Sequence, residues 1–179
     1  MRLAVQILSV LLLVGALGSP RLGWRRLSFA GFVALAMASF ALRAGWPGRA
    51  LAPTACEGLV GSELALHSFR NTPHIVLFAL CFGIARAQFG AAGAGGWARW
   101  RPYAGAFALT IVVGALVELA EGASGAGHCR LRDLLPDTAG ALLGWAALVV
   151  IAAAWARWGP RRSAFAALPH SIRQTHDRE

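Results

Sequence analysis

Residues 118–144 have the sequence ELAEGASGAGHCRLRDLLPDTAGALLG, which contains two pairs of acids between two long apolar runs. The first run extends from Phe107 to Val117 and the second from Ala141 to Ala154. An ionised side chain in a bilayer-length apolar segment is costly unless it is paired, bound to a cation or facing water. The stretch therefore predicts two membrane helices and marks the acids at their ends as a candidate site.

The rest of the chain is also apolar. Its 179 residues are 57% hydrophobic and 14% charged, which is more apolar than a soluble domain of this length needs. A helix that crosses the hydrocarbon layer needs about 20 residues. Five runs approach or reach that length, at Leu3–Gly18, Leu27–Trp46, Pro73–Phe89, Pro102–Gly122 and Pro136–Trp155. The sequence thus predicts an all-α fold, a polytopic membrane bundle of five transmembrane helices.

By composition the chain divides into three parts. Residues 1–26 are the expected first transmembrane helix and a basic inner loop, residues 27–158 the transmembrane core with an outer loop at 48–71, and residues 159–179 a basic, polar C-terminal tail. Residues 1–19 also match the plan of a secretory signal. Because arginines follow that segment at once and resist export, we expect the first helix to be retained.

Charge predicts the orientation of the bundle. The net charge is +9, but the arginines lie at the ends of apolar runs instead of forming the basic stripe of a nucleic-acid-binding protein, so we expect no nucleic-acid partner. The arginine-rich side of a membrane protein is cytoplasmic. Five crossings therefore place the N-terminus outside and the C-terminus in the cytoplasm. Eleven arginines are then inside, namely Arg21, Arg25, Arg26, Arg86, Arg99, Arg101, Arg157, Arg161, Arg162, Arg173 and Arg178, and six are outside, namely Arg2, Arg43, Arg49, Arg70, Arg130 and Arg132.

The acids have the opposite distribution. Only Asp177 and Glu179 lie inside, and the outer acids are Glu57, Glu63, Glu118, Glu121, Asp133 and Asp137. Within the outer loop, the apolar spacing between Cys56 and Phe69 predicts a short helix lying in the interface. The outer side is therefore where we expect the functional site.

Four of the outer acids are spaced to share helix faces. Glu118 and Glu121 are three residues apart, so their carboxylates lie on one face of a helix. Asp133 and Asp137 are four apart near the start of the last helix, where the positive end of the helix dipole favours ionised carboxylates. Asp133 is explained equally well as a helix cap. Asp137 is the stronger candidate because the helix is apolar one turn further on.

Three basic residues complete the candidate site. His74 opens the third apolar run on the same side as the acids, which favours a site role over that of an interfacial polar residue. Arg130 and Arg132 are the obvious counter-ions for the acids, and ion pairing alone is the alternative explanation of the whole set. We expect one outward-facing pocket between the third, fourth and last helices, formed by Glu118, Glu121, Asp133, Asp137, His74 and Arg130.

The three cysteines bear on this site. Cys56 and Cys129 lie on the outer side, where oxidation is permitted, and Cys81 lies within the third helix. A disulfide between Cys56 and Cys129 needs Cα atoms within about 7 Å and would tie the outer loop over the cluster, while two free thiols are the alternative. The chain has no paired-cysteine zinc motif, so we assign no metal ligand. A divalent cation is the only cofactor considered.

The motif Asp133-Leu-Leu-Pro-Asp137-Thr-Ala-Gly140-Ala-Leu-Leu-Gly144 resembles the Asp-x-x-x-Asn-x-x-Gly-x-x-x-Gly run of the VanZ-like family of small bacterial membrane proteins. Glu118-Leu-Ala-Glu121 is similar to its Glu-x-x-Gln, and His74 to the histidine that opens an earlier helix. The resemblance covers about residues 70–150, and it implies a VanZ-like core in the last three to four helices and a place in the bacterial inner membrane. Gly140 and Gly144 form a small face that lets a neighbouring helix approach closely.

Several positions depart from the family pattern. Asp137 stands where the family has Asn, Glu121 where it has Gln, and Asn71-Thr72 where Asp-Lys commonly precedes the histidine. Arg130 also lies closer to Asp133 than the family arginine does. The two acids in place of amides make this site more negative.

Three functions are compatible with these residues. The first is a VanZ-like envelope protein whose outer pocket binds a membrane lipid headgroup, a lipid-linked envelope precursor or a cation. The second is an integral membrane enzyme acting on a lipid-linked phosphate or peptide, with carboxylates as base or metal ligands and Arg130 or Arg132 on the phosphate. The third is a small transporter or proton relay that uses Glu118 and Asp137, although no inverted repeat is visible.

Overall fold

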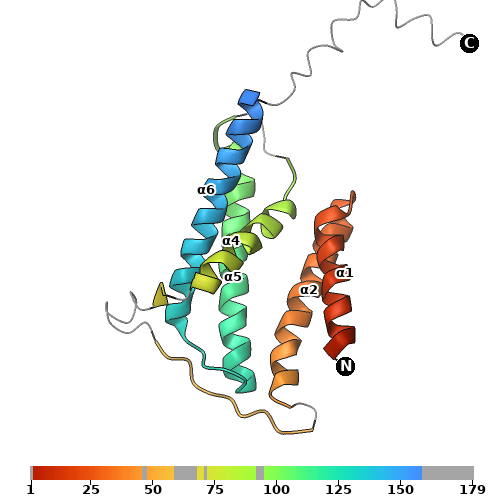
Figure 1. Cartoon of the computed structure of the whole chain (residues 1–179), viewed down its shortest axis with the longest axis vertical. Helices are drawn as coiled ribbons and strands as arrows, with labels where there is room; N and C mark the ends of the chain where they lie inside the picture. The colour runs from red at the N-terminus through yellow and green to blue at the C-terminus, as the bar shows by residue number, and fades with distance from the viewer. Residues whose placement is uncertain (1, 46–47, 59–67, 71, 92–94, 159–179) are drawn as a thin grey trace, which may run out of the picture. The chain divides into compact units, whose positions relative to one another are not determined.

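The computed structural model describes residues 2–45, 48–58, 68–70, 72–91 and 95–158. Helix accounts for 79% of these residues, and no strand longer than a single bridge occurs among them. The predicted all-α class is therefore confirmed. In chain order the helices (Figure 1) are α1 (Arg2–Gly18), α2 (Leu22–Arg43), α4 (Thr72–Ala87), α5 (Gly96–Ser124), the short 3-10 helix η1 (Leu131–Asp133) and α6 (Leu134–Trp158).

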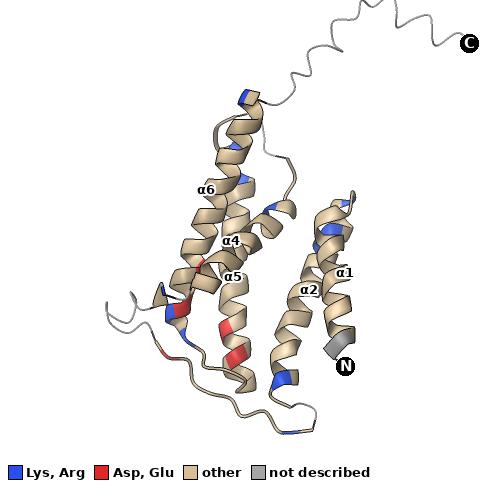
Figure 2. Ribbon diagram, viewed as in Figure 1, with Lys and Arg blue, Asp and Glu red and all other residues tan. Residues whose placement is uncertain are grey.

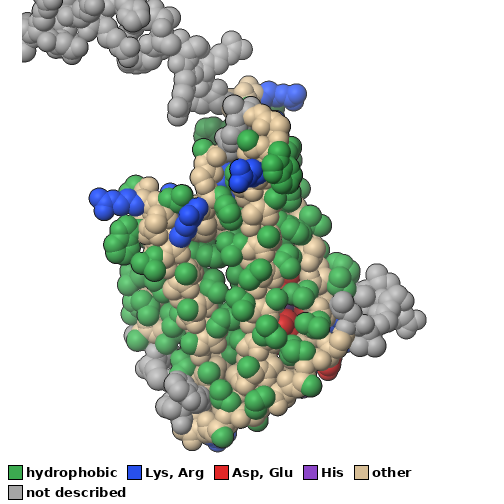
Figure 3. All heavy atoms as spheres, turned by 180° about the vertical axis from the view of Figure 1, so that it is seen from behind, with side chains coloured by type: hydrophobic (Ala, Val, Ile, Leu, Met, Phe, Trp, Pro, Cys, Tyr) green, Lys and Arg blue, Asp and Glu red, His purple; other side chains and the backbone are tan. Residues whose placement is uncertain are grey.

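Three of these segments are long and apolar enough to cross a membrane, namely Leu22–Arg43, Gly96–Ser124 and Leu131–Trp158. The helices α1 and α4 are apolar but shorter. Large hydrophobic side chains such as Leu11 and Val76 are more than half exposed. Figure 3 shows one face on which such side chains cover most of the surface between charged groups. Large exposed apolar surfaces mark contact with a partner or a membrane, so the length and composition of these helices are compatible with a membrane protein.

The chain divides into two compact units, Met1–Ala146 and Ala147–Glu179, so that α6 passes from the first into the second. Within the first unit the helices alternate in direction. The start of α2 bonds to the end of α4, through Arg25 Nη1 and the Ala87 carbonyl. The end of α5 bonds to the segment after α2, through the Gly122 carbonyl and Thr54 N. All the described acids lie at this second end (Figure 2), which we call the acidic end, and we call the first the arginine end.

Two helices begin five or more residues before their apolar runs, while the other starts differ by one or two residues. α2 begins at Leu22 instead of Leu27, so Arg25 and Arg26, expected in a loop, belong to its first two turns. Their guanidinium groups donate to the carbonyl oxygens of Ala87, the last residue of α4, and Gln88, the residue after it. The last carbonyls of a helix have no donor within the helix, so the two arginines satisfy them. The arginines thereby gain partners of their own, and α2 can begin before its apolar run.

α5 begins at Gly96 instead of Pro102 and is 29 residues long, or about 44 Å. Pro102 lies within the helix and is buried. Because the hydrocarbon layer is about 30 Å thick, a helix of this length extends into the headgroup layer. The first turn, with Trp97 and Arg99, has the composition that such an interface favours.

The predicted interfacial helix between Cys56 and Phe69 falls mainly on residues 59–67, which lie outside the described residues. Its first residues, 56–58, are not helical, so that part of the prediction is wrong. The reason is that Glu57 is paired in an isolated parallel bridge with Arg130. A backbone that bonds to a second segment cannot also make the bonds of a helix.

Small residues set the packing of α4, α5 and α6. The buried face of α5 is a row of residues four apart, namely Pro102, Ala106, Thr110, Gly114, Glu118 and Gly122. A Cβ atom on Gly140 of α6 would collide with the carbonyl oxygen of Ile75 in α4, and one on Gly144 would lie 2.6 Å from the Ala79 carbonyl oxygen. The predicted packing role of both glycines is thus confirmed, because only glycine permits this approach.

Candidate functional site

The first component of the site is a pair between α4 and α6 at the acidic end. His74, in the first turn of α4, has its Nδ1 atom 3.0 Å from Oδ1 of Asp137, in the first turn of α6. The Asp137 side chain is 2% exposed and that of His74 is 29% exposed. When the ring is neutral, a carboxylate at this distance holds the proton on Nδ1 and leaves Nε2 as an acceptor.

Glycines make room for this pair. A Cβ atom on Gly114 of α5 would lie 2.7 Å from Oδ2 of Asp137, so the carboxylate occupies space that an alanine would fill. Gly140, one turn after Asp137, brings α6 against the first turns of α4. The imidazole also stacks on Phe78, one turn further along α4, with ring centroids 6.2 Å apart. The pair is therefore defined by the backbones of three helices.

Glu118 lies one turn beyond Gly114 on the same buried face of α5. Its Oε2 atom accepts a hydrogen bond of 2.6 Å from the backbone N–H of Arg130. The side chain is buried, and this bond supplies a donor to a carboxylate that would otherwise be costly at this depth. Glu118 thus holds the segment before η1 against α5.

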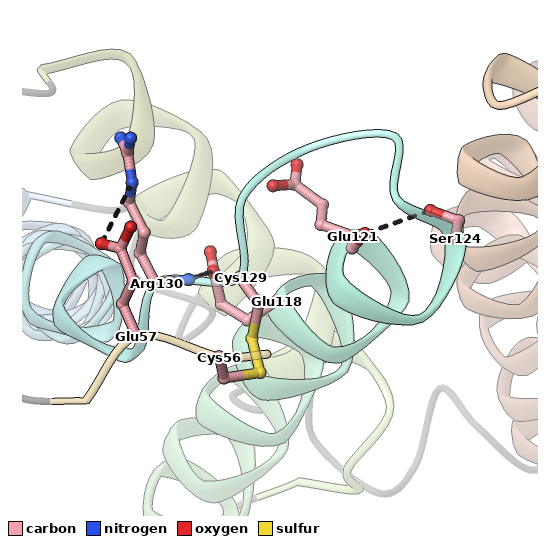
Figure 4. Close-up of a disulfide and its surroundings, with 7 residues drawn as sticks. All are labelled: Cys56, Glu57, Glu118, Glu121, Ser124, Cys129 and Arg130. Carbon is pink, nitrogen blue, oxygen red and sulfur yellow. Dashed lines mark hydrogen bonds and ion pairs between the residues drawn. A yellow bond between two sulfur atoms is a disulfide. The ribbon is translucent and has the colours of Figure 1, made fainter. Parts of the chain in front are cut away.

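A disulfide joins Cys56 to Cys129, with Cα atoms 4.5 Å apart (Figure 4). The sequence left open a disulfide or two free thiols, and the structure has the disulfide. Backbone hydrogen bonds beside the disulfide continue the contact. Glu57 N donates to the Cys129 carbonyl at 2.8 Å, and Leu131 N donates to the Glu57 carbonyl at 3.2 Å. Cys129 is buried, and its Cβ atom lies against Gly122 of α5. The segment around Cys56 and Glu57 is in this way fastened to the end of α5 and to the segment before α6.

The arginine side chains have a different partner from the one expected. The Arg130 Nε and Arg132 Nη2 atoms lie 3.6 and 3.9 Å from the same oxygen, Oε2 of Glu57. Neither guanidinium pairs with Glu118 or Asp137 among the described contacts, and Glu118 is met by the backbone of Arg130 instead. The expectation that the arginines serve as counter-ions for the helix acids is thus wrong for these two carboxylates.

The remaining two predicted acids have looser surroundings. The Glu121 carboxylate lies beside Gly127, where a Cβ atom would be 2.6 Å from Oε2. The bond drawn to Glu121 in Figure 4 joins its backbone carbonyl to the hydroxyl of Ser124. Asp133 lies in η1, and its backbone N donates to the Arg130 carbonyl. For the carboxylates of Glu121 and Asp133, the described part of the chain offers no hydrogen bond or ion pair.

The structure brings the predicted residues to one end of the first unit and distributes them over three sets of contacts. These are His74 with Asp137, Glu118 with the Arg130 backbone, and Glu57 with the two arginines. Their convergence in a single pocket stays a prediction. Among the described residues, no group of three or more His, Cys, Asp or Glu could hold a metal ion.

Sequence reasoning missed the part that Glu57 plays. It was placed on the outer side as one of six acids, without a role. The available signal was its position directly after Cys56, because a disulfide to Cys129 brings residue 57 beside residue 130.

Comparisons with models of protein families, with curated proteins and with solved structures found no match to this chain. The resemblance to the VanZ-like family therefore remains a prediction that rests on the motifs around His74, Glu118 and Asp137.

Proposed function

We propose that this chain is a VanZ-like protein of the bacterial inner membrane. It binds an anionic group at the outward-facing surface of that membrane. The ligand is a lipid headgroup or a lipid-linked envelope precursor. One observation carries the choice of an anion over a cation: two guanidinium groups turn towards a single carboxylate that is half exposed. Guanidinium groups match phosphate and carboxylate oxygens in shape and charge, so an external anion suits the place of Glu57.

The proposal includes five crossings, with the N-terminus outside and the C-terminus in the cytoplasm. The alternating helices and the one-sided acids support it. α1 and α4 have 17 and 16 residues, or about 26 and 24 Å, which is shorter than the hydrocarbon layer. Local thinning of the bilayer and snorkelling of Arg86 at the end of α4 make such a crossing feasible. Reporter fusions after Glu179 and within residues 48–58 test the orientation, and a C-terminal reporter found outside the cell would refute it.

Binding is tested with a double variant, Arg130→Gln and Arg132→Gln, in the full-length protein in detergent. We expect the wild type to bind a fluorescent anionic lipid and the double variant to lose most of that affinity. Arg70→Gln is the matched control, because Arg70 is an exposed arginine before α4 whose side chain has no partner among the described residues. Equal binding by the wild type and the double variant would refute the anion site.

A second candidate, a membrane enzyme acting on a lipid-linked phosphate or peptide, is favoured by the geometry of His74 and Asp137. A buried carboxylate that orients a part-exposed imidazole is an arrangement suited to proton transfer. Asp137→Asn keeps a hydrogen-bond partner and restores the residue usual in the resembling family, so we expect it to be tolerated. Asp137→Leu should abolish activity in a protein that still inserts and folds. If Asp137→Leu lowers only thermal stability and protein abundance, the pair is structural.

A further inference from the structure

The backbone around Glu57 is fixed much more firmly than its side chain. The preceding residue, Cys56, forms the disulfide with Cys129. The N–H and the carbonyl of Glu57 both make backbone hydrogen bonds to the segment around Arg130. The facing segment is itself held by Glu118, which accepts the Arg130 N–H (Figure 4). The position of Glu57 relative to the two arginines is therefore set by covalent and backbone contacts, independently of the ion pairs.

The ion pairs themselves are loose. Their distances of 3.6 and 3.9 Å are longer than a charge-assisted hydrogen bond of about 2.8 Å. The Nε atom of Arg130 is buried and has no hydrogen-bond partner among the described residues. The Glu57 side chain is 50% exposed, and exposed pairs of this kind are worth about 1 kcal/mol or less. Glu57 thus offsets one of the two guanidinium charges without satisfying the donors of either arginine.

Among the described residues, the other acids do not take part in this pairing. The carboxylates of Glu118 and Asp137 are buried against the Arg130 backbone and His74 respectively. The Arg130 Nε atom is buried, but the side chains of Arg130 and Arg132 are 38% and 19% exposed, and their terminal nitrogens have no hydrogen-bond partner among the described residues. A phosphate group offers several acceptor oxygens to such nitrogens and binds guanidinium groups through two parallel hydrogen bonds.

We infer that Glu57 is a tethered competitor for the phosphate group that Arg130 and Arg132 bind. This inference rests on the proposed anion site. Because the disulfide and the bridge hold the Glu57 carboxylate beside the arginines, its effective concentration there is high. Every ligand must displace the same carboxylate, so Glu57 weakens the binding of a phosphate monoester and of a diester by the same factor.

The test compares Glu57→Gln with the wild type and with Asp177→Asn, which removes an acid of the C-terminal tail that is not among the candidate site residues. Full-length protein in a zwitterionic detergent is titrated with fluorescent phosphatidic acid, a monoester, and with fluorescent phosphatidylglycerol, a diester. Soluble glycerol phosphate is added as a competitor to separate recognition of the phosphate from recognition of the lipid. A second variant, Glu57→Ala, and a non-reducing gel establish that the disulfide and the fold are retained.

We expect Glu57→Gln to bind both lipids about tenfold more tightly than the wild type, since the competing charge near 4 Å is removed for both. Asp177→Asn should change neither affinity by more than about twofold. Unchanged or weaker binding in both Glu57 variants would overturn the competitor, even where loss of binding in the double arginine variant upholds the anion site. A larger gain for the monoester than for the diester would also overturn it, because a carboxylate that stays in place repels the doubly charged ligand more. No binding by any of these proteins would overturn both the competitor and the anion site.

Discussion

The two ends of the first unit use arginine in different ways. At the arginine end, Arg25 makes three hydrogen bonds of 2.8 to 3.1 Å, to the carbonyl oxygens of Ser19 and Ala87. At the acidic end, the guanidinium groups of Arg130 and Arg132 reach one carboxylate among the described residues, that of Glu57, at 3.6 and 3.9 Å. The first arrangement satisfies helix ends that would otherwise lack donors. The second leaves donors free.

This difference separates a structural end from a candidate binding end. Charges at both ends lie beside apolar helices, so their presence alone does not distinguish the two. What distinguishes them is the partner, which is a helix carbonyl at one end and a part-exposed side chain from a distant segment at the other. Variants that affect one end and spare the other therefore test the comparison directly.

The largest effect on stability should come from releasing the acidic end. The Cys56–Cys129 disulfide closes a separation of 73 residues, so it removes much entropy from the unfolded chain. The double variant Cys56→Ser, Cys129→Ser should lose about 2–5 kcal/mol of unfolding free energy. Denaturation in detergent measures this, with Cys81→Ala as the control because Cys81 is a free thiol. Equal stability of the oxidised and reduced wild type would contradict the prediction.

The next effect belongs to the arginine end. Arg25→Gln removes hydrogen bonds from a charged group to two carbonyls, and should cost about 1.5–3 kcal/mol in the same unfolding experiment. Affinity for the anionic lipid should not change. Arg21→Gln is the control, because Arg21 is exposed and its side chain has no recorded partner among the described residues. A loss of lipid affinity in Arg25→Gln would show that the two ends are not independent.

A third variant tests how helix packing defines the His74–Asp137 pair. Gly140→Ala places a methyl group against the Ile75 carbonyl and 2.9 Å from the Phe78 Cβ atom, and should destabilise the protein by about 1–3 kcal/mol. Gly83→Ala in α4 is the matched control, since nothing lies within 4 Å of the added atom. That change should be neutral or stabilise by up to about 1 kcal/mol, because alanine is the better helix former. Similar losses in both variants would mean that the close approach at Gly140 is unimportant.

Much of the fold could be predicted from apolar runs, since each run of membrane length became a helix. The starts of α2 and α5 could not be predicted in this way. An apolar run ends at the edge of the hydrocarbon layer, but the helix itself can extend beyond that edge. Arg25 continues α2 by bonding to the end of another helix, and that partner is invisible in a local pattern. The gathering of the described acids at one end was easier to predict than helix length, because the charges of each connection are read directly from the sequence.

The candidate site could be predicted as a set but not as pairs. His74 and Asp137 were both expected at the same end, yet their contact spans 63 residues and depends on the space left by Gly114 and Gly140. Glu57 was not assigned a role, because a loop acid has no periodic pattern and its position next to Cys56 was the one signal in the sequence. Its place follows only once the disulfide fixes the register of two distant segments.

The smallest effect on stability should come from Arg132→Gln, and it gives the sharpest form of the comparison. The Arg132 side chain is 19% exposed, and its pairing with Glu57 at 3.9 Å is screened by solvent, so its loss should cost less than about 1 kcal/mol of unfolding free energy. Lipid binding should nevertheless fall by about tenfold or more, since a guanidinium–phosphate contact is lost. Thermal unfolding and lipid titration on the same sample measure both quantities, with Arg70→Gln as the control. If Arg132→Gln instead destabilises the protein as much as Arg25→Gln and leaves binding intact, arginine serves the same structural purpose at both ends. Added salt separates the two outcomes further, because it should weaken lipid binding by the wild type more than it changes its stability.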